Sequence, residues 1–352
     1  DLPNLYGKCP FCYIHGMITS APILVTGVAG FIGFHLANRL LRDGHSVIGV
    51  DSLTSYYSTK LKKDRLAQLD HPNFQFIHLD LADHDAVMAL FADIKPQKVI
   101  HLAAQAGVRY SIENPAAYMD SNMTGFFHIL EASRQHDIEH LIYASSSSVY
   151  GASTDYPFSE QQPVNHPVSF YAATKKANEA MAHSYAHRYG LPCTGLRFFT
   201  VYGAWGRPDM ALFKFTKGIF DGTPIDIYNH GDMYRDFTYV EDLVRGIRLL
   251  MDAVPGGPET AVEGDTLSPA APYRVVNIGN SDKVRLLDFI EAIEAETGIA
   301  AKRNYMEMQK GDVFATWADA SLLRNLTGYT PKTDVRDGVA KFVAWYRDYY
   351  RV

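Results

Sequence analysis

The sequence predicts an α/β fold in which a parallel β-sheet is covered by helices on both of its faces. From residue 22 onward, short apolar segments alternate with longer segments whose apolar residues recur at helical spacing. The short segments are apolar almost throughout, rather than at every second position. Apolar strands separated by helices are typical of parallel sheets, because such strands are buried on both faces.

The elements of the first half follow one another in a regular order. The first strand, PILVTG at 22–27, leads into a helical segment at 31–44 that ends on Gly44. Beyond it we expect strands at 46–51, 74–81, 98–104 and 140–145, with helices at 86–94 and 123–137. The second half is less regular, and its Pro- and Gly-rich stretch at 255–272 predicts a surface loop.

Composition and charge narrow the class of protein. A hydrophobic content of 47% with 20% charged residues is that of an ordinary globular protein. The net charge of −6 and the lack of a basic stripe argue against nucleic acid as a partner. No apolar run is long enough to cross a bilayer, so we expect no membrane partner. Three cysteines make no disulfide framework and suit a reducing cytosol, so we expect a cytoplasmic protein.

The first twenty residues lack this pattern. We interpret residues 1–20 as a leader or tag-like extension, since Met17 begins MITSAPILVTG and resembles a natural start. The alternative is a redox or metal site built from Cys9, Cys12 and His15. A redox CxxC motif should follow a strand and open a helix, and a structural zinc site needs four ligands. Because neither condition is met, we expect no bound metal.

A glycine-rich turn joins the first strand to the first helix. In TGVAGFIG, Gly27, Gly30 and Gly33 have the GxxGxxG spacing. Glycine lets the backbone approach a pyrophosphate, and a helix N-terminus adds free N–H groups and a favourable dipole. Asp51 closes the second strand about 20 residues further on, where a carboxylate binds the adenosine ribose, and Asp80 would accept a hydrogen bond from the adenine amino group. The pattern predicts a Rossmann-type dinucleotide site, and Asp51 favours NAD over NADP because its charge repels a 2′-phosphate.

A second motif follows the fifth strand. Tyr171 and Lys175 lie four residues apart and so share one face of a helix. A tyrosine with its ordinary pKa of about 10 is a poor base at neutral pH, but a nearby ammonium and a positive nicotinamide ring would both stabilise its phenolate. That phenolate could take a proton from a sugar hydroxyl. Such a pair alone is more often a surface pair, but its place after a serine-bearing strand indicates a catalytic one.

Motifs spread over the chain carry a resemblance to a known family. They are TGVAGFIG, HLAAQAGVRYS, SSSSVYG, YAATK and GDMYRDFTYVEDL. With them, the chain from about residue 21 to its end resembles the extended short-chain dehydrogenase/reductases, and AAQAGVRYSIENP and FFTVYGAWGRPDMALFKF make it most similar to the UDP-glucuronate 4-epimerases. The resemblance implies a doubly wound Rossmann domain at 21–200, with a helix at 168–189, that holds NAD. It implies a smaller C-terminal α/β domain at 201–352 that binds the UDP-sugar, with some segments returning to the Rossmann sheet.

The resemblance also implies roles for individual residues. Ser146 would hydrogen-bond the reacting oxygen, Tyr171 would be the acid/base, and Lys175 would support Tyr171 and anchor the nicotinamide ribose. Arg235 corresponds to the arginine that pairs with the UDP phosphates, a charge-assisted contact, and Asp312 lies where the family binds the uridine ribose. The residues implied in NAD binding are Gly27, Gly30, Phe31, Ile32, Gly33, Asp51, Asp80, Leu81, Ala103, Ala104, Gln105, Asn122, Tyr171 and Lys175.

Two departures bear on the subgroup. Gln309 stands where neutral-sugar epimerases commonly carry a second phosphate-binding arginine, and glutamine is typical of the glucuronate epimerases. The stretch AWGRPDM departs from the usual PRQRPDM, which leaves the conformation of the loop around Arg207 open.

Ser147 and Ser148 occupy positions that distinguish related reactions. In related 4,6-dehydratases an acidic pair follows the catalytic hydroxyl residue, and in UDP-glucuronate decarboxylases a glutamate does. Hydroxyls instead suit an ionised carboxylate, which accepts hydrogen bonds and cannot donate them. We expect Ser147 and Ser148, with Thr200, Arg207 and Arg109, to hold the C5 carboxylate of the sugar. The alternative is that the two serines only cap the end of the strand.

Together these residues predict an isomerase, a UDP-glucuronate 4-epimerase that forms UDP-galacturonate through a 4-keto intermediate. One alternative is a C4 epimerase of a neutral UDP-hexose or pentose. Another is a UDP-glucuronate decarboxylase, which the missing glutamate disfavours. A third is a catalytically silent nucleotide-sugar sensor, which the presence of both Tyr171 and Lys175 disfavours. The family also implies a homodimer formed through helices at roughly 115–136 and 168–189, although these helices could equally serve the monomer core.

Overall fold

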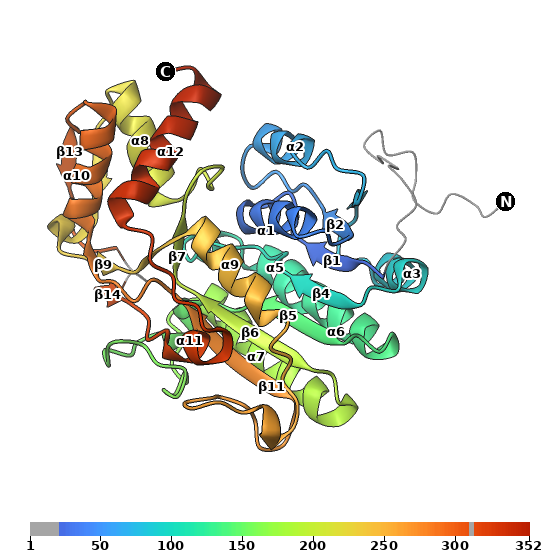
Figure 1. Ribbon diagram of the computed structural model, residues 1–352. Helices are drawn as coiled ribbons and strands as arrows, with labels where there is room; N and C mark the ends of the chain where they lie inside the picture. The colour runs from blue at the N-terminus through green and yellow to red at the C-terminus, as the bar shows by residue number, and fades with distance from the viewer. Residues whose placement is uncertain (1–20, 310–312) are drawn as a thin grey trace.

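The computed structural model describes residues 21–309 and 313–352, and its centre is a seven-stranded sheet (Figure 1). All neighbouring strands are parallel, in the order β11-β6-β5-β4-β1-β2-β3. The strands are β1 (Ile23–Thr26), β2 (Val47–Asp51), β3 (Phe74–His78), β4 (Lys98–His101), β5 (His140–Ala144), β6 (Cys193–Phe198) and β11 (Tyr273–Ile278). The strand order reverses between β1 and β4, so the predicted doubly wound α/β class is confirmed.

Helices cover both faces of the sheet. One core contains residues of α1 (Phe31–Arg42), α9 (Val240–Leu250) and α11 (Ser321–Thr327), and the other contains residues of α3 (His84–Ile94), α6 (Gly125–Gln135) and α7 (Phe170–Tyr189). Ile23 and Val25 of β1 belong to the first core, and Leu24 between them belongs to the second. The strands are therefore apolar at every position because each side chain enters one of two cores.

The helical stretch expected at 123–137 is longer and is divided into pieces. The short helices α4 (Tyr110–Glu113) and α5 (Pro115–Tyr118) precede a π-helical turn, η1 (Met119–Thr124), which leads into α6. Asn114 accepts a hydrogen bond from the N–H of Ala117 at 3.4 Å and so caps α5. Pro115 at the first position of α5 also favours a helix start, because proline has no N–H that would be left without a partner there.

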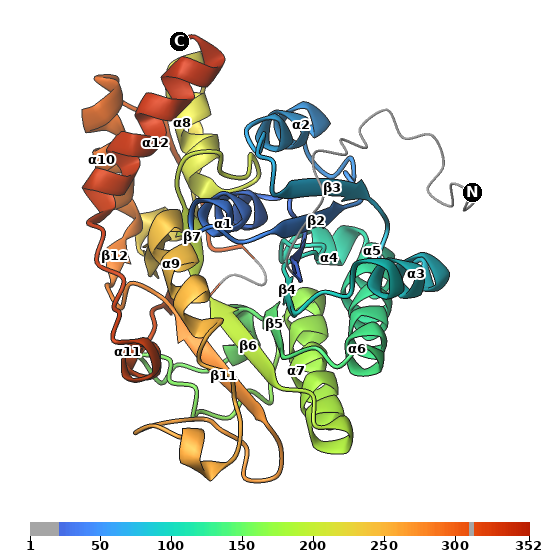
Figure 2. The ribbon, with the colours of Figure 1, turned by 45° about the vertical axis from the view of Figure 1, so that its right-hand side comes forward.

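A second lobe follows the sixth strand. Figure 2 shows its helices grouped to one side of the sheet, and they are α8 (Ala211–Asp221), α10 (Leu286–Thr297) and α12 (Val335–Tyr350). Short strands accompany them: β7 (Thr200–Tyr202) with β10 (Phe237–Tyr239), β8 (Ile225–Ile227) with β13 (Arg303–Tyr305), and β9 (Tyr234–Arg235) between β12 (Val284–Arg285) and β14 (Ala315–Thr316). Phe237 and Phe289 stack with their ring centroids 3.9 Å apart at the centre of this lobe. The later segments β11 and α9 lie in the large sheet and on its face.

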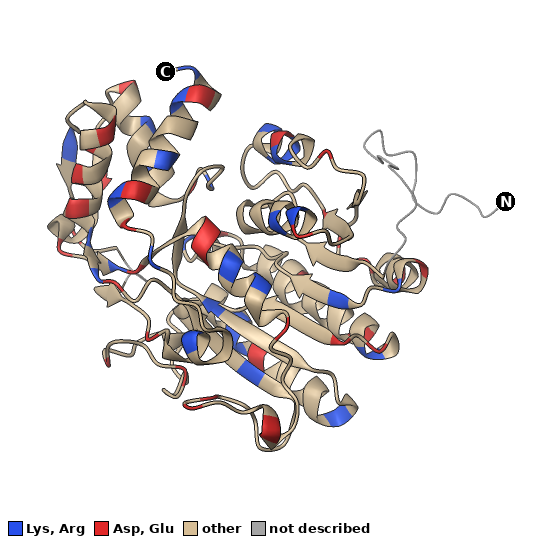
Figure 3. Cartoon of the chain, viewed as in Figure 1, with Lys and Arg blue, Asp and Glu red and all other residues tan. Residues whose placement is uncertain are grey.

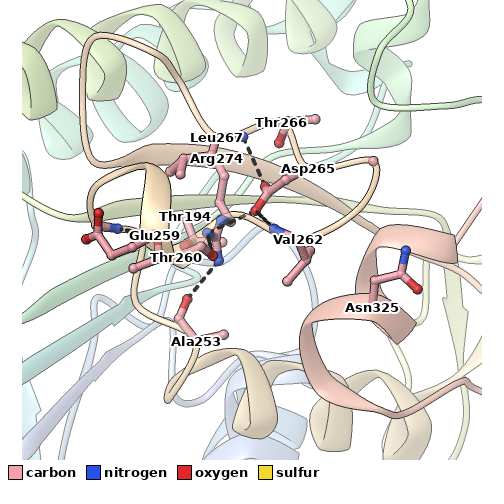
Figure 4. Close-up of polar contacts among 12 residues, drawn as sticks. Thr194, Ala253, Glu259, Thr260, Val262, Asp265, Thr266, Leu267, Arg274 and Asn325 are labelled. Atoms are coloured by element: carbon pink, nitrogen blue, oxygen red, sulfur yellow. Dashed lines mark hydrogen bonds and ion pairs between the residues drawn. The ribbon is translucent and has the colours of Figure 1, made fainter.

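The loop at 255–272 is anchored through buried polar contacts (Figure 4). Arg274 of β11 forms an ion pair with Asp265 at 3.1 Å and donates to the carbonyls of Ala253 and Thr260, each at 3.2 Å. The hydroxyl of Thr266 bonds both the N–H and the carbonyl of Val275. The Thr266 contacts occupy backbone groups of Val275 on the outer edge of β11, which would otherwise be open to pairing with another strand.

Charged residues are mixed in sign over the drawn helices (Figure 3). Along α12 basic and acidic residues are interspersed, whereas α9 has its two acids in the first turn and its two arginines after them. Across the described ranges, no helix combines the length and the apolar character that a membrane span requires.

Candidate active site

A cavity of about 910 Å³ opens at the carboxyl ends of the large sheet and extends to the second lobe. Its lining comes from the loops after β1, β2, β3, β4 and β5, from the start of α7, and from β7, α8 and β9. Ligands of doubly wound folds bind at this edge, where the strand order reverses. The cavity therefore has one side formed by the sheet and another formed by the second lobe.

The glycine-rich turn after β1 forms part of the sheet side. Gly27 has φ +73°, and a Cβ atom added there would lie 2.7 Å from the backbone N of Ala103. A Cβ atom on Gly33 would lie 2.1 Å from the carbonyl oxygen of Gly27. Only glycine fits these two positions, and α1 therefore starts close against the turn with its free N–H groups near the cavity. Gly27, Gly30, Phe31, Ile32 and Gly33 all line the cavity, which suits a bound pyrophosphate.

Asp51 lies at the end of β2 and ties this strand to the glycine turn. Its carboxylate accepts hydrogen bonds from the N–H groups of Ala29 at 3.1 Å and Leu53 at 2.8 Å. Burial raises the pKa of Asp51, and the backbone N–H bond from Leu53 and the charge of Lys62 oppose that rise. Lys62 lines the cavity and donates to the carbonyl of Thr54 at 2.8 Å. Sequence reasoning missed Lys62, because nothing in its spacing marks it as a neighbour of Asp51.

The residues after β3 and β4 complete the sheet side. Asp80, Leu81, Ala103, Ala104 and Gln105 all line the cavity. Asn122 does not reach it. The Asn122 side chain is buried behind the wall, where it accepts a hydrogen bond from the N–H of Gln105 at 2.8 Å and donates to Gln105 carbonyl and Thr174 hydroxyl, each at 3.1 Å. These bonds hold Gln105, which lines the cavity, and the expected contact of Asn122 with the cofactor stays a prediction.

The serine run after β5 divides into an inner and an outer part. Ser145 is buried and donates a hydrogen bond at 2.7 Å to Glu179, which is paired with Arg197 at 2.9 Å. The oxygen of Ser146 accepts a hydrogen bond from the N–H of Ser148 at 3.2 Å and caps the short helix η2 (Ser147–Tyr150). The inner contact of Ser145 was not predicted, because Glu179 lies a helix away in sequence. Ser146, Ser147 and Ser148 line the cavity, as does Ser145 in part.

Tyr171 and Lys175 lie in the first two turns of α7, whose start is capped by Ser169. Burial raises the pKa of Tyr171, while a hydrogen bond from Ser146 and the positive charge of Arg207 act to lower that pKa. Lys175 donates to the carbonyl of Ala144 at 2.8 Å, and burial lowers the pKa of Lys175 to about 8. Within the protein, Ser146 and Arg207 are therefore groups that favour the phenolate, and the expected support of Tyr171 by Lys175 stays a prediction.

Arg207 and Thr200 line the cavity from the second lobe. Arg207 donates from Nε to Asp209 at 3.0 Å and forms a second, shorter contact from Nη2 to the other carboxylate oxygen. Tyr56 donates to the same carboxylate at 3.1 Å. Burial would raise the pKa of Asp209, but the Arg207 charge holds it below its usual value. Sequence reasoning missed Asp209 and Tyr56, although RPD in the sequence was a signal for an arginine with an adjacent acid.

Two further arginines lie in the cavity wall. The Arg109 guanidinium lies over the ring of Tyr228 in the second lobe, 4.8 Å from the ring centroid, and its expected place near the sugar carboxylate stays a prediction. Arg235 on β9 donates to the carbonyls of Tyr234 and Val313, each at 2.8 Å. Asp312 lies outside the described residues, so its predicted role has no structural account. In the described part of the chain, no cluster of three or more His, Cys, Asp or Glu residues could hold a metal ion.

Comparisons with known proteins agree with this geometry. The sequence profile of the NAD dependent epimerase/dehydratase family matches residues 23–279. The chain is 56% identical over 331 residues to Protein CapI of Staphylococcus aureus, covering 94% of this chain and 99% of that protein. It is 50% identical over 334 residues to a probable UDP-glucuronate 4-epimerase of Rhizobium meliloti, covering 93% and 97% of the two chains. The crystal structure of a UDP-glucuronic acid 4-epimerase from Bacillus cereus, in complex with UDP-glucuronic acid and NAD, is similar with a TM-score of 0.84 and 32% identity, covering 94% and 100% of the two chains.

Proposed function

The chain belongs to the NAD-dependent epimerase/dehydratase family and is an NAD-dependent epimerase, and from that premise we propose that it interconverts UDP-glucuronate and UDP-galacturonate. One observation carries the choice of sugar. Ser147 and Ser148 line the same cavity as Tyr171 and Arg207. An acid pair or a glutamate, which dehydration or decarboxylation would use, is absent from these two positions. Hydroxyls and a guanidinium are donors, and a sugar carboxylate is the acceptor that they match.

The proton transfers fall to Tyr171. As a phenolate it would take the proton from the 4-OH of the sugar, held there by the hydroxyl of Ser146. NAD held in the cavity would supply a reversible acceptor for the hydride at C4 of the sugar. Lys175 would hold the nicotinamide ribose, and its buried ammonium adds positive charge near the site. The sugar rotates between the two transfers while its UDP group stays anchored, and Tyr171 then returns the proton.

The carboxylate contacts would protect the 4-keto intermediate. A ketone at C4 and a carboxylate at C5 form a β-keto acid, which loses CO₂ when the bond to the carboxylate aligns with the carbonyl π system. Ser147, Ser148 and Thr200 would donate neutral hydrogen bonds, and Arg207 a charged one, to keep that bond close to the carbonyl plane. Arg207 is paired with Asp209, so it would exchange one carboxylate partner for another.

The nucleotide and the second subunit belong to the proposal as well. Arg235 would pair with the UDP phosphates, and Asp312 with the uridine ribose. We propose a homodimer through η1, α6 and α7, supported by the exposed apolar side chains of Met119, Phe127 and Phe170 on these elements. Exposed apolar side chains on neighbouring helices indicate an interaction surface.

Proton NMR of the purified protein with UDP-glucuronate, without added reductant, tests the proposal. We expect the signals of UDP-galacturonate to appear without net consumption of NAD. Turnover of UDP-glucose alone would assign a neutral-sugar epimerase instead, and a 4-keto-pentose as the main product would assign a decarboxylase. Tight binding without any turnover would support a nucleotide-sugar sensor.

A further inference from the structure

The loop that carries Arg207 is held by the opposite lobe through its backbone. His35 of α1 contacts the carbonyl of Ala204 at 2.9 Å. Arg65 at the end of α2 (Thr59–Ala67) donates to the carbonyl of Trp205 at 2.7 Å and to that of Gly206 at 3.2 Å. Three successive carbonyls directly before Arg207 are therefore fixed by side chains of the sheet lobe.

Arg65 also connects this loop to the cofactor side. It is fully buried and donates to the carbonyl of Ala29 in the glycine turn at 2.8 Å. One guanidinium thus bonds backbone on both sides of the cavity. Its planar fork of donors suits this arrangement, because each contact fixes the direction of the others.

Trp205 provides a second hold on the loop. Its backbone has φ +60°, a left-handed conformation that a bulky residue adopts only where its surroundings impose it. Its ring packs against Phe34 of α1 at 5.7 Å, and against Trp345 and Tyr349 of α12 at 5.3 and 5.2 Å between ring centroids. We call these four residues the Trp205 cluster. The hydroxyl of Tyr349 also donates to Asp64 of α2, so α1, α2 and α12 meet at this point.

We propose that Trp205 is a positioning residue for Arg207, and that the C-terminal helix α12 thereby takes part in selecting a sugar with a carboxylate. This inference rests on the proposed function. Trp205 lies in a turn closed by a hydrogen bond from the N–H of Gly206 to the carbonyl of Gly203 at 3.1 Å, and Arg207 directly follows this turn. Because the Trp205 ring is held between the lobes, the Arg207 guanidinium starts from a fixed backbone. Without the ring, nothing holds the side chain of residue 205, and the turn can relax from the unfavourable left-handed conformation at this position.

The test measures binding separately from turnover. Titration calorimetry on the NAD-loaded holoenzyme, in a Tyr171→Phe background that prevents turnover, gives dissociation constants for UDP-glucuronate, UDP-glucose and UDP. We expect Trp205→Ala to weaken the binding of UDP-glucuronate about tenfold, which is the effect of losing one charge-assisted hydrogen bond. The dissociation constants of UDP-glucose and UDP should change by less than about twofold. Trp205→Phe should bind UDP-glucuronate almost as tightly as the parent, because a smaller ring still packs between Phe34 and Trp345.

Matched variants keep the test decisive. Trp317→Phe removes a tryptophan that stacks on Tyr156 away from the cluster and should change none of the three constants. Tyr349→Phe removes only the hydroxyl that reaches Asp64 and should weaken UDP-glucuronate selectively but less, so it carries the test if Trp205→Ala does not fold. If Trp205→Ala or Tyr349→Phe weakens the binding of all three ligands equally, or if neither variant weakens the binding of UDP-glucuronate, the positioning role is wrong.

Failure of the proposed function would look different. If the Tyr171→Phe parent binds UDP-glucuronate no better than UDP-glucose, and the wild-type protein does not epimerise UDP-glucuronate, then both proposals fail before any Trp205 variant is compared. If the wild-type protein epimerises UDP-glucuronate and the Trp205 variants bind it unchanged, only the present inference fails.

Discussion

The two sides of the cavity are built in different ways. The proposed cofactor side is lined mainly by the glycine turn, the start of α1 and the strand ends, and Asp51 is bonded to two backbone N–H groups there. The proposed sugar side is lined by side chains such as Arg207, which lies on a loop between the lobes. A backbone site takes its shape as the sheet forms, whereas a side-chain site depends on how the two lobes pack.

This difference has a consequence for substitutions. A change on the cofactor side should affect NAD in the same way whatever sugar is present. A change on the sugar side should affect one substrate more than another, because each side chain contacts one chemical group. Tyr171 lies where the two sides meet and should affect every turnover.

Tyr171→Phe changes the residue between the two sides of the cavity and should have the largest effect on turnover. Loss of the phenol removes the acid/base, which usually contributes about 10²–10⁴-fold, while NAD and UDP binding stay nearly intact. Steady-state epimerisation and separate binding titrations check this. Tyr189→Phe, at the exposed end of the same helix, is the control and should turn over normally. More than a tenth of the wild-type kcat in Tyr171→Phe would remove Tyr171 from the mechanism.

Arg207→Ala tests the sugar side. We expect KM for UDP-glucuronate to rise by roughly tenfold or more, since a hydrogen bond to a charged group contributes about 1.5–3 kcal/mol. A larger fraction of turnovers should end in a 4-keto-pentose, because the carboxylate is no longer held near the carbonyl plane. CO₂ release per epimerisation measures this, and reduced cofactor stranded by decarboxylation gives a second signal. A rise in KM without extra CO₂ would mean that Arg207 binds the sugar but does not protect the intermediate.

Asp51→Asn tests the cofactor side. The amide keeps an oxygen for one backbone N–H but loses the charge that repels a 2′-phosphate. We expect NAD to bind several-fold more weakly and the preference for NAD over NADP to narrow, with the same change in the presence of UDP-glucuronate or UDP-glucose. Titration of the stripped protein with both cofactors measures it. An unchanged preference would show that Asp51 serves only the backbone of the glycine turn.

The serine run allows the smallest and most local test. Ser147→Ala and Ser148→Ala should each raise CO₂ release weakly, because a neutral hydrogen bond is worth about 1 kcal/mol. Ser145→Ala is the matched control: it loses the bond to buried Glu179 and should lower the melting temperature without raising CO₂ release. If all three alanine variants behave alike, the run is a polar strand end and the carboxylate role of the outer serines is wrong.

Much of the fold was predictable because its signals are local. Strands that are buried on both faces are apolar at every position, and such runs are visible in the sequence. The glycines after β1 are visible too, because only glycine fits the tight turn at Gly27 and Gly33. The break of the helix before α6 was missed, because the π-helical turn at η1 leaves no mark in the apolar spacing. In the site, Tyr171 and Lys175 were found from their position on one helix, but the Lys175 partner, the carbonyl of Ala144, belongs to β5.

By itself, the sequence determined the class of fold, the glycine turn, the acid after the second strand and the pair on α7, since each is a matter of residue type at short spacing. Only the tertiary structure decided which serine bonds the buried Glu179, that Asn122 bonds Gln105, and what holds the Arg207 loop. The bonds that answer these questions join residues far apart in the chain, such as Arg65 and Trp205, which are separated by 140 positions. Residue spacing contains no information about such contacts, because they arise only when the packed lobes bring the two surfaces together.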